Sequence, residues 1–498
     1  MTQRHPGYAL AWYNLGNVLQ EQERHEESLE TFSRAIQLDS ALADAHNNLG
    51  RALHKLERFE AAEQAYRRCL ALRPDYALGN FNLASVLMDR GRFAEAVTVC
   101  RQALQRAPRD ADLLLKLGSA HTHLGEMTAA LEAFRAAADA APENPRALWA
   151  QGYALVRTGN EQEGLRWLER ASALQPDSQA FRAALSSIHL SMGNLRAGWA
   201  LHEWRPARVS FLARNPDLRP VTALPDQLPG LRICLLREQG LGDELFFLRF
   251  AAALKSRGAE ITCRVNARLV PMLERVPALA RNVAAEGALP EADLHMLMGD
   301  LPQALGATDF PPPVELSPLP RMLESMKERL AALGPPPYVG LTWRAGIAPE
   351  QQRGTEWVLH KAVPPESLCG ALRNVEGTLI ALQRNPEGGE VERLATLAGR
   401  PVHDLTALNE DLEGMLALLA IVDDYIGVSN TNMHLRAGAG RGARVLVPCP
   451  PEWRWMANGE ESPWFPGFRI YRQRPDGDWN DALTTLAFDL REKRGSTR

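Results

Sequence analysis

An acidic residue at the start of a helix is the first group in this sequence that could do chemistry. It ends the stretch Glu238-Gln-Gly-Leu-Gly-Asp243, which follows an apolar run typical of a buried parallel strand. Gly240 and Gly242 allow a tight turn and a close ligand approach, and a helix N-terminus offers unpaired N–H groups. The carboxylate of Asp243 could accept a proton as a general base. An acid that only stabilises the first helical turn is the alternative, and it stays open.

A second polar cluster follows another apolar run and leads into a helix. Parallel strands and helix N-termini present N–H groups to ligands at such positions, so this loop suits a diphosphate. Its hydroxyl, amide and imidazole groups would bind phosphate oxygens. A capping motif with a packed histidine is an equally open interpretation. The residues concerned are Ser429, Asn430, Thr431, Asn432 and His434.

Two cations stand near the start of the last third of the chain. Arg344 follows a predicted strand, and Lys361 lies further along. Both could hold a leaving nucleotide by stabilising its growing negative charge, although each could also be a solvated surface charge. No Asp-x-Asp stands at a strand end, and Asp423 and Asp424 should point to opposite faces of a strand. We therefore expect no metal and no cofactor.

Aromatic residues crowd the C-terminal part of the chain, in Pro451 to Trp455 and in Ser462 to Pro466. Aromatic planes beside arginines suit a nucleobase or a sugar face. Trp453, Trp455 and Arg472 are therefore candidates for the rim of a ligand site. The same residues suit a segment that straps two parts of the molecule together, and both interpretations stay open.

The first two hundred residues repeat with a period of 34. Small residues let paired helices cross closely, and a proline stops the second helix of each pair. The pattern resembles the tetratricopeptide repeat, in about six copies from Ala9 to about Trp204. The small residues are Gly16, Gly50, Ala84, Gly118, Gly152 and Ser186, and the prolines are Pro74, Pro108, Pro142 and Pro176.

Such a superhelix exposes a groove that holds extended peptide, so the segment is interpreted as a protein-binding arm. Asn14, Asn48 and Asn82 recur on the first helix of the early repeats. Asparagine there can hydrogen-bond both N–H and C=O of a guest backbone. The same residues could equally be solvated, and the arm could equally be a scaffold or a dimerisation element.

After the repeats, residues 205–230 contain five prolines and read as a linker. Short apolar strands then alternate with helices in two blocks, 231–333 and 334–498. Such alternation predicts two Rossmann-like halves that face each other across a cleft. The predicted fold class is thus an α-solenoid followed by an α/β protein of two parallel-sheet halves, with strands at 231–236, 260–265, 293–298, 338–343, 378–382, 424–428 and 443–447.

The overall composition narrows the classes of partner. The 498 residues carry a net charge of −4, which gives no basic field for nucleic acid, and no apolar run reaches the length of a membrane span. The six cysteines are scattered without CxxC spacing, as in a reducing compartment. Because the first six residues show no signal-peptide core, we expect a cytoplasmic protein.

Together these motifs resemble bacterial proteins in which tetratricopeptide repeats precede a heptosyltransferase-like glycosyltransferase of the GT-B fold. The matching stretches are Glu238 to Asp243, Pro451 to Trp455, Ser462 to Pro466, Arg472-Gln473 and Ala381-Leu-Gln383. The resemblance implies that Asp243 is the base and that Lys361 and Gln383 lie on the donor side. It also maps Val428 to His434 onto the family's V-D-T-x-x-x-H loop, from which Ser429 and Asn430 depart.

The resemblance implies an inverting, metal-independent glycosyltransferase. The expected reaction moves a sugar from a nucleotide sugar to a Ser or Thr hydroxyl of a protein, such as flagellin or another surface protein, held by the repeats. Hexosyl, heptosyl and nonulosonic-acid donors all remain open. A non-catalytic repeat adaptor with a degenerate transferase domain, or a transferase acting on a glycan or lipid, are the alternatives.

Overall fold

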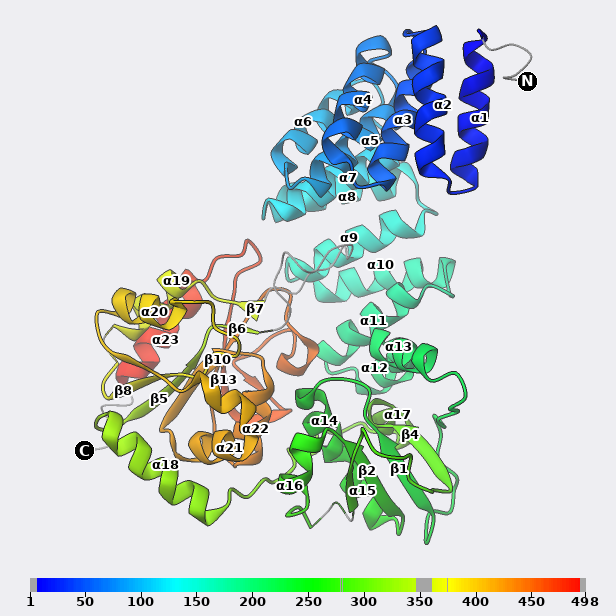
Figure 1. The fold of residues 1–498 in the computed structure, drawn as a ribbon. Coiled ribbons are helices and arrows are strands. Elements are labelled where there is room, and N and C mark those ends of the chain that lie inside the picture. Colours follow the sequence, from blue (N-terminus) through cyan, green and yellow to red (C-terminus); the bar gives the residue numbers. More distant parts are fainter. Residues whose placement is uncertain (1–6, 278, 280, 346–360, 374, 493–498) are drawn as a thin grey trace. The chain divides into compact units, whose positions relative to one another are not determined.

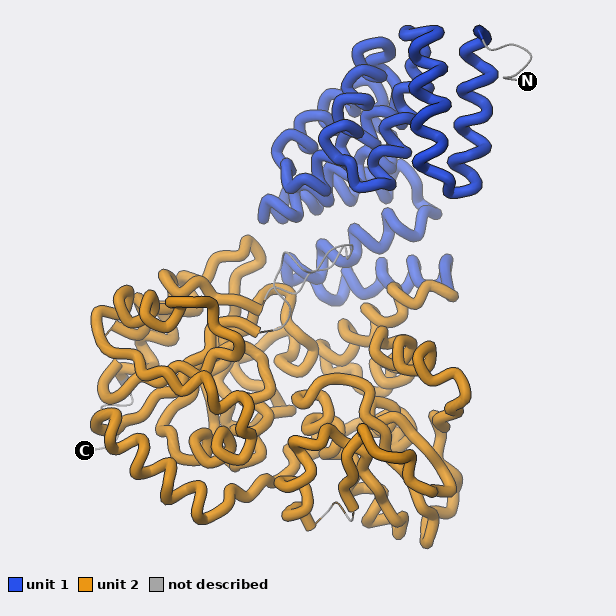
Figure 2. Tube along the Cα trace, in the orientation of Figure 1, with its two compact units in different colours: residues 1–176 blue, residues 177–498 orange. Residues whose placement is uncertain are grey.

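The chain divides into two compact units, residues 1–176 and 177–498 (Figure 2). The computed structural model describes residues 7–277, 279, 281–345, 361–373 and 375–492. The first six residues, on which the cytoplasmic expectation partly rests, lie outside this description. In the described ranges, each helix is too short or too polar to cross a bilayer.

The first unit is built from pairs of helices (Figure 1). A tight turn joins the helices of each pair, and its residue with positive φ recurs every 34 residues, at Glu23, Glu57, Gly91, Gly125 and Gly159. The helices are α1 Ala9–Glu21, α2 His25–Leu38, α3 Ala43–Lys55, α4 Phe59–Leu72, α5 Ala77–Asp89, α6 Phe93–Leu104, α7 Ala111–His123, α8 Met127–Ala140, α9 Pro145–Arg157 and α10 Glu161–Leu174.

Close packing within each pair explains the small residue of the repeat. A methyl group added at Gly50 would lie 2.6 Å from the ring of Tyr66, which fills the gap between α3 and α4. Both Tyr66 and Phe32, its equivalent one repeat earlier, are fully buried. The first unit is therefore a helical solenoid whose periodicity follows from the 34-residue pattern.

The second unit begins with one more helix pair, α11 Gln179–Ser191 and α12 Leu195–Leu201, followed by the short helix η1 His202–Trp204. Helix α13 Pro206–Arg214 comes next, inside the segment that the prolines marked as a linker. Pro206 occupies the first position of this helix, where its missing N–H costs nothing.

A parallel sheet of four strands in the order β3-β2-β1-β4 follows. Strand β1 pairs with β2 on one side and with β4 on the other, so the strand order reverses at β1. Ligands of open α/β sheets bind outside the carboxyl ends of strands at such a reversal. The elements are β1 Arg232–Leu236, α14 Leu241–Phe247, η2 Leu248–Phe250, α15 Ala251–Ser256, β2 Glu260–Val265, η3 Ala267–Leu269, α16 Val270–Leu273, β3 Arg281–Ala284, β4 Leu294–Leu297, η4 Met298–Asp300 and α17 Leu301–Ala304.

A second sheet of seven strands has the order β12-β13-β11-β10-β5-β8-β9 and is parallel except for the β12–β13 pair. Its order reverses between β5 and β10. The elements are α18 Pro320–Leu333, β5 Tyr338–Thr342, β6 Arg344–Ala345, β7 Lys361–Ala362, α19 Pro365–Leu372, β8 Thr378–Ala381, α20 Glu390–Ala398, β9 Val402–Asp404, η6 Thr406–Glu410, α21 Leu412–Ile421, β10 Asp424–Val428, α22 Thr431–Gly438, β11 Arg444–Val447, η7 Trp453–Trp455, β12 Glu461–Ser462, β13 Phe465–Arg472 and α23 Asn480–Glu492.

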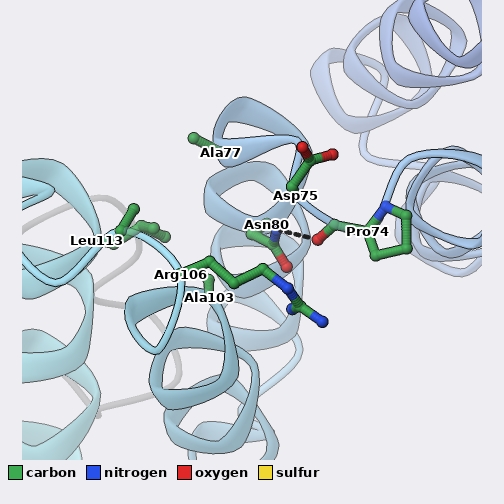
Figure 3. A pocket seen from close by; sticks show the side chains of 8 residues that line it. Pro74, Asp75, Ala77, Asn80, Ala103, Arg106 and Leu113 are labelled. Carbon is green, nitrogen blue, oxygen red and sulfur yellow. Dashed lines mark hydrogen bonds between the residues drawn. The ribbon is translucent and has the colours of Figure 1, made fainter.

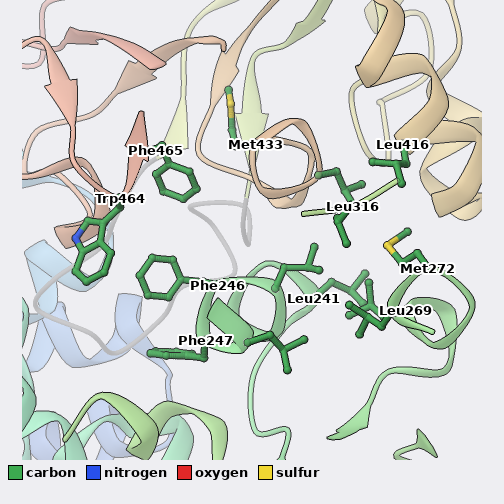
Figure 4. Packing of buried hydrophobic residues seen from close by; sticks show 14 of the residues in the cluster. Leu241, Phe246, Phe247, Leu269, Met272, Leu316, Leu416, Met433, Trp464 and Phe465 are labelled. Atoms are coloured by element: carbon green, nitrogen blue, oxygen red, sulfur yellow. The ribbon is translucent and has the colours of Figure 1, made fainter. Parts of the chain in front are cut away.

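One continuous apolar core joins the two sheet-bearing parts of this unit. Phe246 of α14 packs against Trp464 and Phe465 from the C-terminal part, with ring centroids 5.1 and 6.3 Å away (Figure 4). This contact fixes the carboxyl end of β1 beside the carboxyl end of β10.

Candidate functional site

Asp243 lies in the first turn of α14, directly beyond the carboxyl end of β1. Its side chain is 27% exposed. The side-chain amide of Gln239, with its nitrogen turned toward the carboxylate, donates to both oxygens of Asp243 at 3.1 Å. The turn thus holds one partly accessible carboxylate in a fixed orientation at the reversal of the first sheet.

Asp243 forms an ion pair with Arg454, which comes from η7 in the C-terminal part. The other side of the same guanidinium contacts Glu452. The second oxygen of Glu452 accepts from the Lys361 ammonium at 2.5 Å and from the Ser429 hydroxyl at 2.9 Å. Four alternating charges therefore run from the first sheet to the second, and we name Asp243, Arg454, Glu452 and Lys361 the charge chain.

The two inner members of the charge chain, Arg454 and Glu452, are buried, with side chains 9% and 12% exposed. Burial alone would raise the pKa of Glu452, but Lys361 and Arg454 outweigh it and hold that pKa well below its ordinary value. Burial lowers the pKa of Arg454, whereas Asp243 and Glu452 raise it above the ordinary value. Both inner charges therefore persist at neutral pH.

Aromatic rings fix the guanidinium of Arg454. Its Cζ lies 4.6 Å from the ring centroids of both Phe246 and Trp453, which is close enough for cation–π attraction. The backbone of the same loop is anchored too, because Ala457 N donates to Ser191 O of α11 at 2.7 Å.

His434 lies against the glycine turn, which explains the small residue at that position. A Cβ on Gly242 would come within 3.1 Å of the imidazole Cδ2 and 3.7 Å of Thr431 Cα. Burial, and then the neighbouring cations Arg454 and Arg249, place the pKa of His434 well below its ordinary value. His434 is thus a neutral packed group beside Asp243, and Gly240 lies at the N-cap of α14.

The remaining residues of the 429–434 loop divide into two groups. Ser429 faces the charge chain, and Thr431 begins α22 next to Gly242. Asn430 instead caps α22 by accepting from Met433 N, and its amide donates to Thr342 Oγ1 at 2.9 Å. Asn432 is buried and hydrogen-bonds Tyr425. In this structure the side chains of Asn430 and Asn432 serve the helix start and the core, and donor binding by them stays a prediction.

Arg344 lies apart from the charge chain and lines a cavity of about 350 Å³ at the carboxyl end of β5. It forms an ion pair with Glu390 at 2.7 Å. The cavity is also lined by Trp343, Pro364, Glu387 and Gly389. Its position at the carboxyl end of β5 and its volume make it a candidate ligand site.

Gln383 supports the wall of that cavity from inside the protein. Its oxygen accepts from the backbone N–H groups of Trp343 and Arg344, each at 3.1 Å. Its nitrogen donates to the carbonyl oxygens of Arg344 and Arg384, each at 3.0 Å. Because a glutamine amide has two donors and two acceptor sites, none is left for a ligand. In this structure Gln383 therefore supports the cavity wall, and direct donor binding by it stays a prediction.

The residues of the predicted aromatic rim are buried or bound to backbone carbonyl groups in this structure. Trp453 is 8% exposed and Trp455 is fully buried, with its ring stacked on Phe465. Arg472 donates to the backbone carbonyl oxygens of Trp455 and Met456 at 2.7 and 3.0 Å. These residues form the strap that was the alternative interpretation, and they hold the loop that carries Arg454.

In the first unit, the predicted peptide-binding asparagines are only partly available. Asn14 is exposed. Asn48 is buried and donates to Asn17 Oδ1 at 2.7 Å and to the Tyr13 hydroxyl at 3.4 Å. Asn82 donates to Asn47 Oδ1 at 3.0 Å. The amides of Asn48 and Asn82 therefore tie neighbouring repeats together, and peptide binding by them stays a prediction.

A small cavity lies between the third and fourth repeats, around Asn80 (Figure 3). Its volume is about 20 Å³, which suffices for one water molecule. Asn80 donates across it to Pro74 O at 3.3 Å. This cavity separates two repeats and has no room for a peptide side chain.

Three important residues escaped the sequence analysis. Glu452 directly precedes Trp453, and Arg454 stands between Trp453 and Trp455, and only their alternation of charge signalled them. Arg205, the first residue of the predicted linker, is buried and donates to both oxygens of Glu238 at 2.8 Å. It also contacts Asp300 at 2.7 Å. Glu238 of the glycine motif is thus an anchor for the chain that enters from the last repeat.

Comparisons with solved structures match the solenoid. YrrB, "a TPR protein with an unusual peptide-binding site", is 21% identical, covers 37% of this chain and 94% of its own, and has a TM-score of 0.31. MamA 41-end from Desulfovibrio magneticus RS-1 is 20% identical over 34% of this chain and 96% of its own, with a TM-score of 0.32.

Among curated proteins, the chain is similar to Protein FlbA of Caulobacter vibrioides (strain ATCC 19089 / CIP 103742 / CB 15). The two are 26% identical over 351 residues, which is 65% of this chain and 57% of FlbA. Because this match is longer than the 176 residues of the first unit, it continues into the second. The chain thus spans little more than half the length of that relative.

Family models identify the repeats directly. A model described as tetratricopeptide repeat matches residues 81–145 and 128–179, and a second model with the same description matches residues 7–75. These matches cover the first unit and reach the start of α11. The N-terminal part of the chain is thus a solenoid of tetratricopeptide repeats.

Proposed function

We propose that the chain is an inverting, metal-independent glycosyltransferase. Residues 177–498 would form a GT-B-like catalytic unit, with the four-stranded part on the acceptor side and the seven-stranded part on the nucleotide-sugar side. The tetratricopeptide solenoid would bind the acceptor protein, whose Ser or Thr hydroxyl receives the sugar.

One observation supports this proposal above the others. The carboxylate of Asp243 follows β1 of the four-stranded sheet, the ammonium of Lys361 lies in β7 of the two-stranded sheet β6–β7, and both belong to one charge chain. A base beside an anion-binding cation is what transfer from a nucleotide sugar requires. The partly exposed side chains of Asp243 and Lys361, 27% and 22%, leave both ends accessible to substrates.

In the proposed reaction, Asp243 takes the proton of the acceptor hydroxyl. The hydroxyl oxygen then forms a bond to the anomeric carbon of the sugar, opposite the leaving group. The bond from that carbon to the phosphate oxygen breaks, and the electron pair leaves with the nucleotide. Lys361 and the N–H groups at the start of α22 would stabilise the departing negative charge. A single displacement of this kind inverts the anomeric configuration.

The cavity beside Arg344 would hold the nucleoside. Its volume of about 350 Å³ lies within the range of small-molecule sites. The carboxylate of Glu387 could accept from ribose hydroxyls, and Trp343 and Pro364 offer apolar surface. Arg344 would then shape the cavity through its ion pair with Glu390 and remain near the phosphates.

A non-catalytic adaptor is the second candidate, because Asp243 is occupied by Arg454 and two asparagines of the 429–434 loop face inward. An adaptor has no need of a nucleotide site. Nucleotide binding therefore discriminates between the two candidates.

The test is calorimetric titration of the full chain with UDP, GDP, ADP, CMP and their sugar conjugates. We expect one nucleotide to bind with a Kd between about 1 μM and about 1 mM. Lys361→Met should weaken the binding of that nucleotide at least about tenfold, since a hydrogen bond to a charged group is lost. Arg24→Ala, which removes an exposed ion pair in the solenoid, is the control and should change nothing. Failure of the whole panel to bind would favour the adaptor.

A further inference from the structure

The base proposed for transfer is occupied in this structure. Oδ1 of Asp243 contacts Arg454, and both carboxylate oxygens accept from Gln239. A carboxylate that is paired with a guanidinium and accepts from an amide is a weaker proton acceptor than a free one. Catalysis therefore requires that Arg454 leave Asp243 at the moment when an acceptor hydroxyl arrives.

Glu452 connects that event with the phosphate side. One of its oxygens contacts Arg454, and the other contacts Lys361 at 2.5 Å and Ser429 at 2.9 Å. If an anion draws Lys361 away, Arg454 becomes the remaining cation beside Glu452, and the repulsion between the two cations that share this carboxylate is lost, so Arg454 can move closer to Glu452. A single carboxylate thus transmits the loss of one partner to the other.

The surroundings of Arg454 favour a movement of the side chain over a movement of the loop. Arg472 and Ser191 hold the backbone on the C-terminal side of η7 through hydrogen bonds to its carbonyl and N–H groups. The flanking rings of Phe246 and Trp453 contact the guanidinium without directional hydrogen bonds. Among the described residues, the buried Nε of Arg454 has no hydrogen-bond partner. A free donor is what a second arrangement of the guanidinium would use.

We infer that Arg454 is a positioning residue that blocks Asp243 until the phosphates of the nucleotide-sugar donor draw Lys361 away from Glu452. This inference rests on the proposed function and adds an order to it: the donor binds first, and the base becomes free afterwards. An idle enzyme would then keep its base paired with Arg454.

Binding of inorganic pyrophosphate to the full chain tests the coupling without any transfer reaction. Coupling is reciprocal, so weakening the Arg454 contact by Asp243→Asn must tighten pyrophosphate binding at Lys361. We expect a tightening of at least about fivefold, the lower end of ordinary coupling. The same substitution in a Glu452→Gln background should change the Kd less than about twofold, because the connection is absent.

If Glu452→Gln does not fold, Arg454→Gln can replace it, because it interrupts the charge chain at the neighbouring residue. In the Arg454→Gln background, too, Asp243→Asn should change the Kd for pyrophosphate less than about twofold. Asp424→Asn is the matched control, since Asp424 is also buried and ion-paired, with Arg444. In that background the full effect of Asp243→Asn should remain.

The inference is overturned if Asp243→Asn changes the Kd for pyrophosphate equally in the wild-type and Glu452→Gln backgrounds. It is also overturned if the wild-type chain does not bind pyrophosphate. The proposed function fails separately. If no sugar is transferred although the coupling is present, the positioning role stands and the glycosyltransferase does not.

Discussion

At the residue scale, two consecutive acids of α14 have opposite environments. Asp243 is partly exposed and faces Arg454, whereas the side chain of Glu244 is only 1% exposed. Burial raises the pKa of Glu244 to about 7, although the N–H of Asn266 and the nearby Arg237 oppose the shift. A buried acid that holds its proton near neutrality makes the stability of this helix sensitive to pH.

The sign of that dependence follows from the direction of the shift. Because the pKa of Glu244 is higher in the folded than in the unfolded chain, its contribution to stability is complete below pH 4.5 and is lost as the pH rises through about 7. Glu244→Gln cannot titrate. Urea unfolding measures the free energy of unfolding of both proteins. Between pH 4 and pH 8 the wild type should lose roughly 3 kcal/mol of it relative to the variant. If the free energies of unfolding of the two proteins change equally with pH, the raised pKa of Glu244 is contradicted.

The residues of the candidate site were predictable only where they belong to a local motif. Asp243, Gly240 and Gly242 stand out because strand, glycine turn and helix are neighbours in the sequence. Arg454 does not stand out, since its partner Asp243 is 211 positions away. Gln383, Trp455 and Asn430 looked functional by residue type, but their hydrogen bonds and burial serve the fold.

At the element scale, the last helix pair belongs to the second unit. Trp199 of α12 packs edge-on against Trp453 and Phe250, with centroids 5.5 and 6.0 Å away. Arg205 joins the next segment to Glu238 and Asp300 in a buried ion network. The compact units divide at Pro176 and Asp177, whereas the sequence placed the end of the superhelix near Trp204.

Two truncated chains test this assignment of α11 and α12. A chain of residues 177–498 should unfold cooperatively on heating and bind nucleotide like the full chain. A chain of residues 205–498 lacks Trp199 and exposes the apolar side chains that pack against it. This should lower the free energy of unfolding by several kcal/mol. We expect it to precipitate or to unfold at a markedly lower temperature. Equal thermal stability of the two chains would show that the last pair is a spacer.

The strands were predictable where they form apolar runs, including the edge strand β4, whereas β13 inside the second sheet was not predicted. Central strands such as β1, β5 and β10 are continuous apolar runs, as buried parallel strands must be. The edge strands β3 and β9 contain few apolar residues and were missed. Helix α13 was missed because Pro206, which begins it, was interpreted as a linker signal.

At the scale of the whole molecule, a repeat unit precedes a unit built on two parallel-rich sheets. The 34-residue period alone was sufficient to predict the solenoid, because each repeat contacts mainly its neighbours. The packing of the two sheet-bearing parts against each other could not be predicted from such a period. It depends on aromatic contacts between α14 and the C-terminal strap, which are distant in sequence.

The proposed catalytic role of Asp243 is tested most directly by intact-mass measurement of candidate acceptor proteins co-expressed with this chain. The wild type should add a discrete sugar mass to one of them. Asp243→Asn should reduce that modification by about 100-fold or more, since a general base is lost, while the nucleotide still binds at least as tightly as it does to the wild type. An Asp243→Asn variant that still modifies the acceptor at most of the wild-type rate would contradict the account.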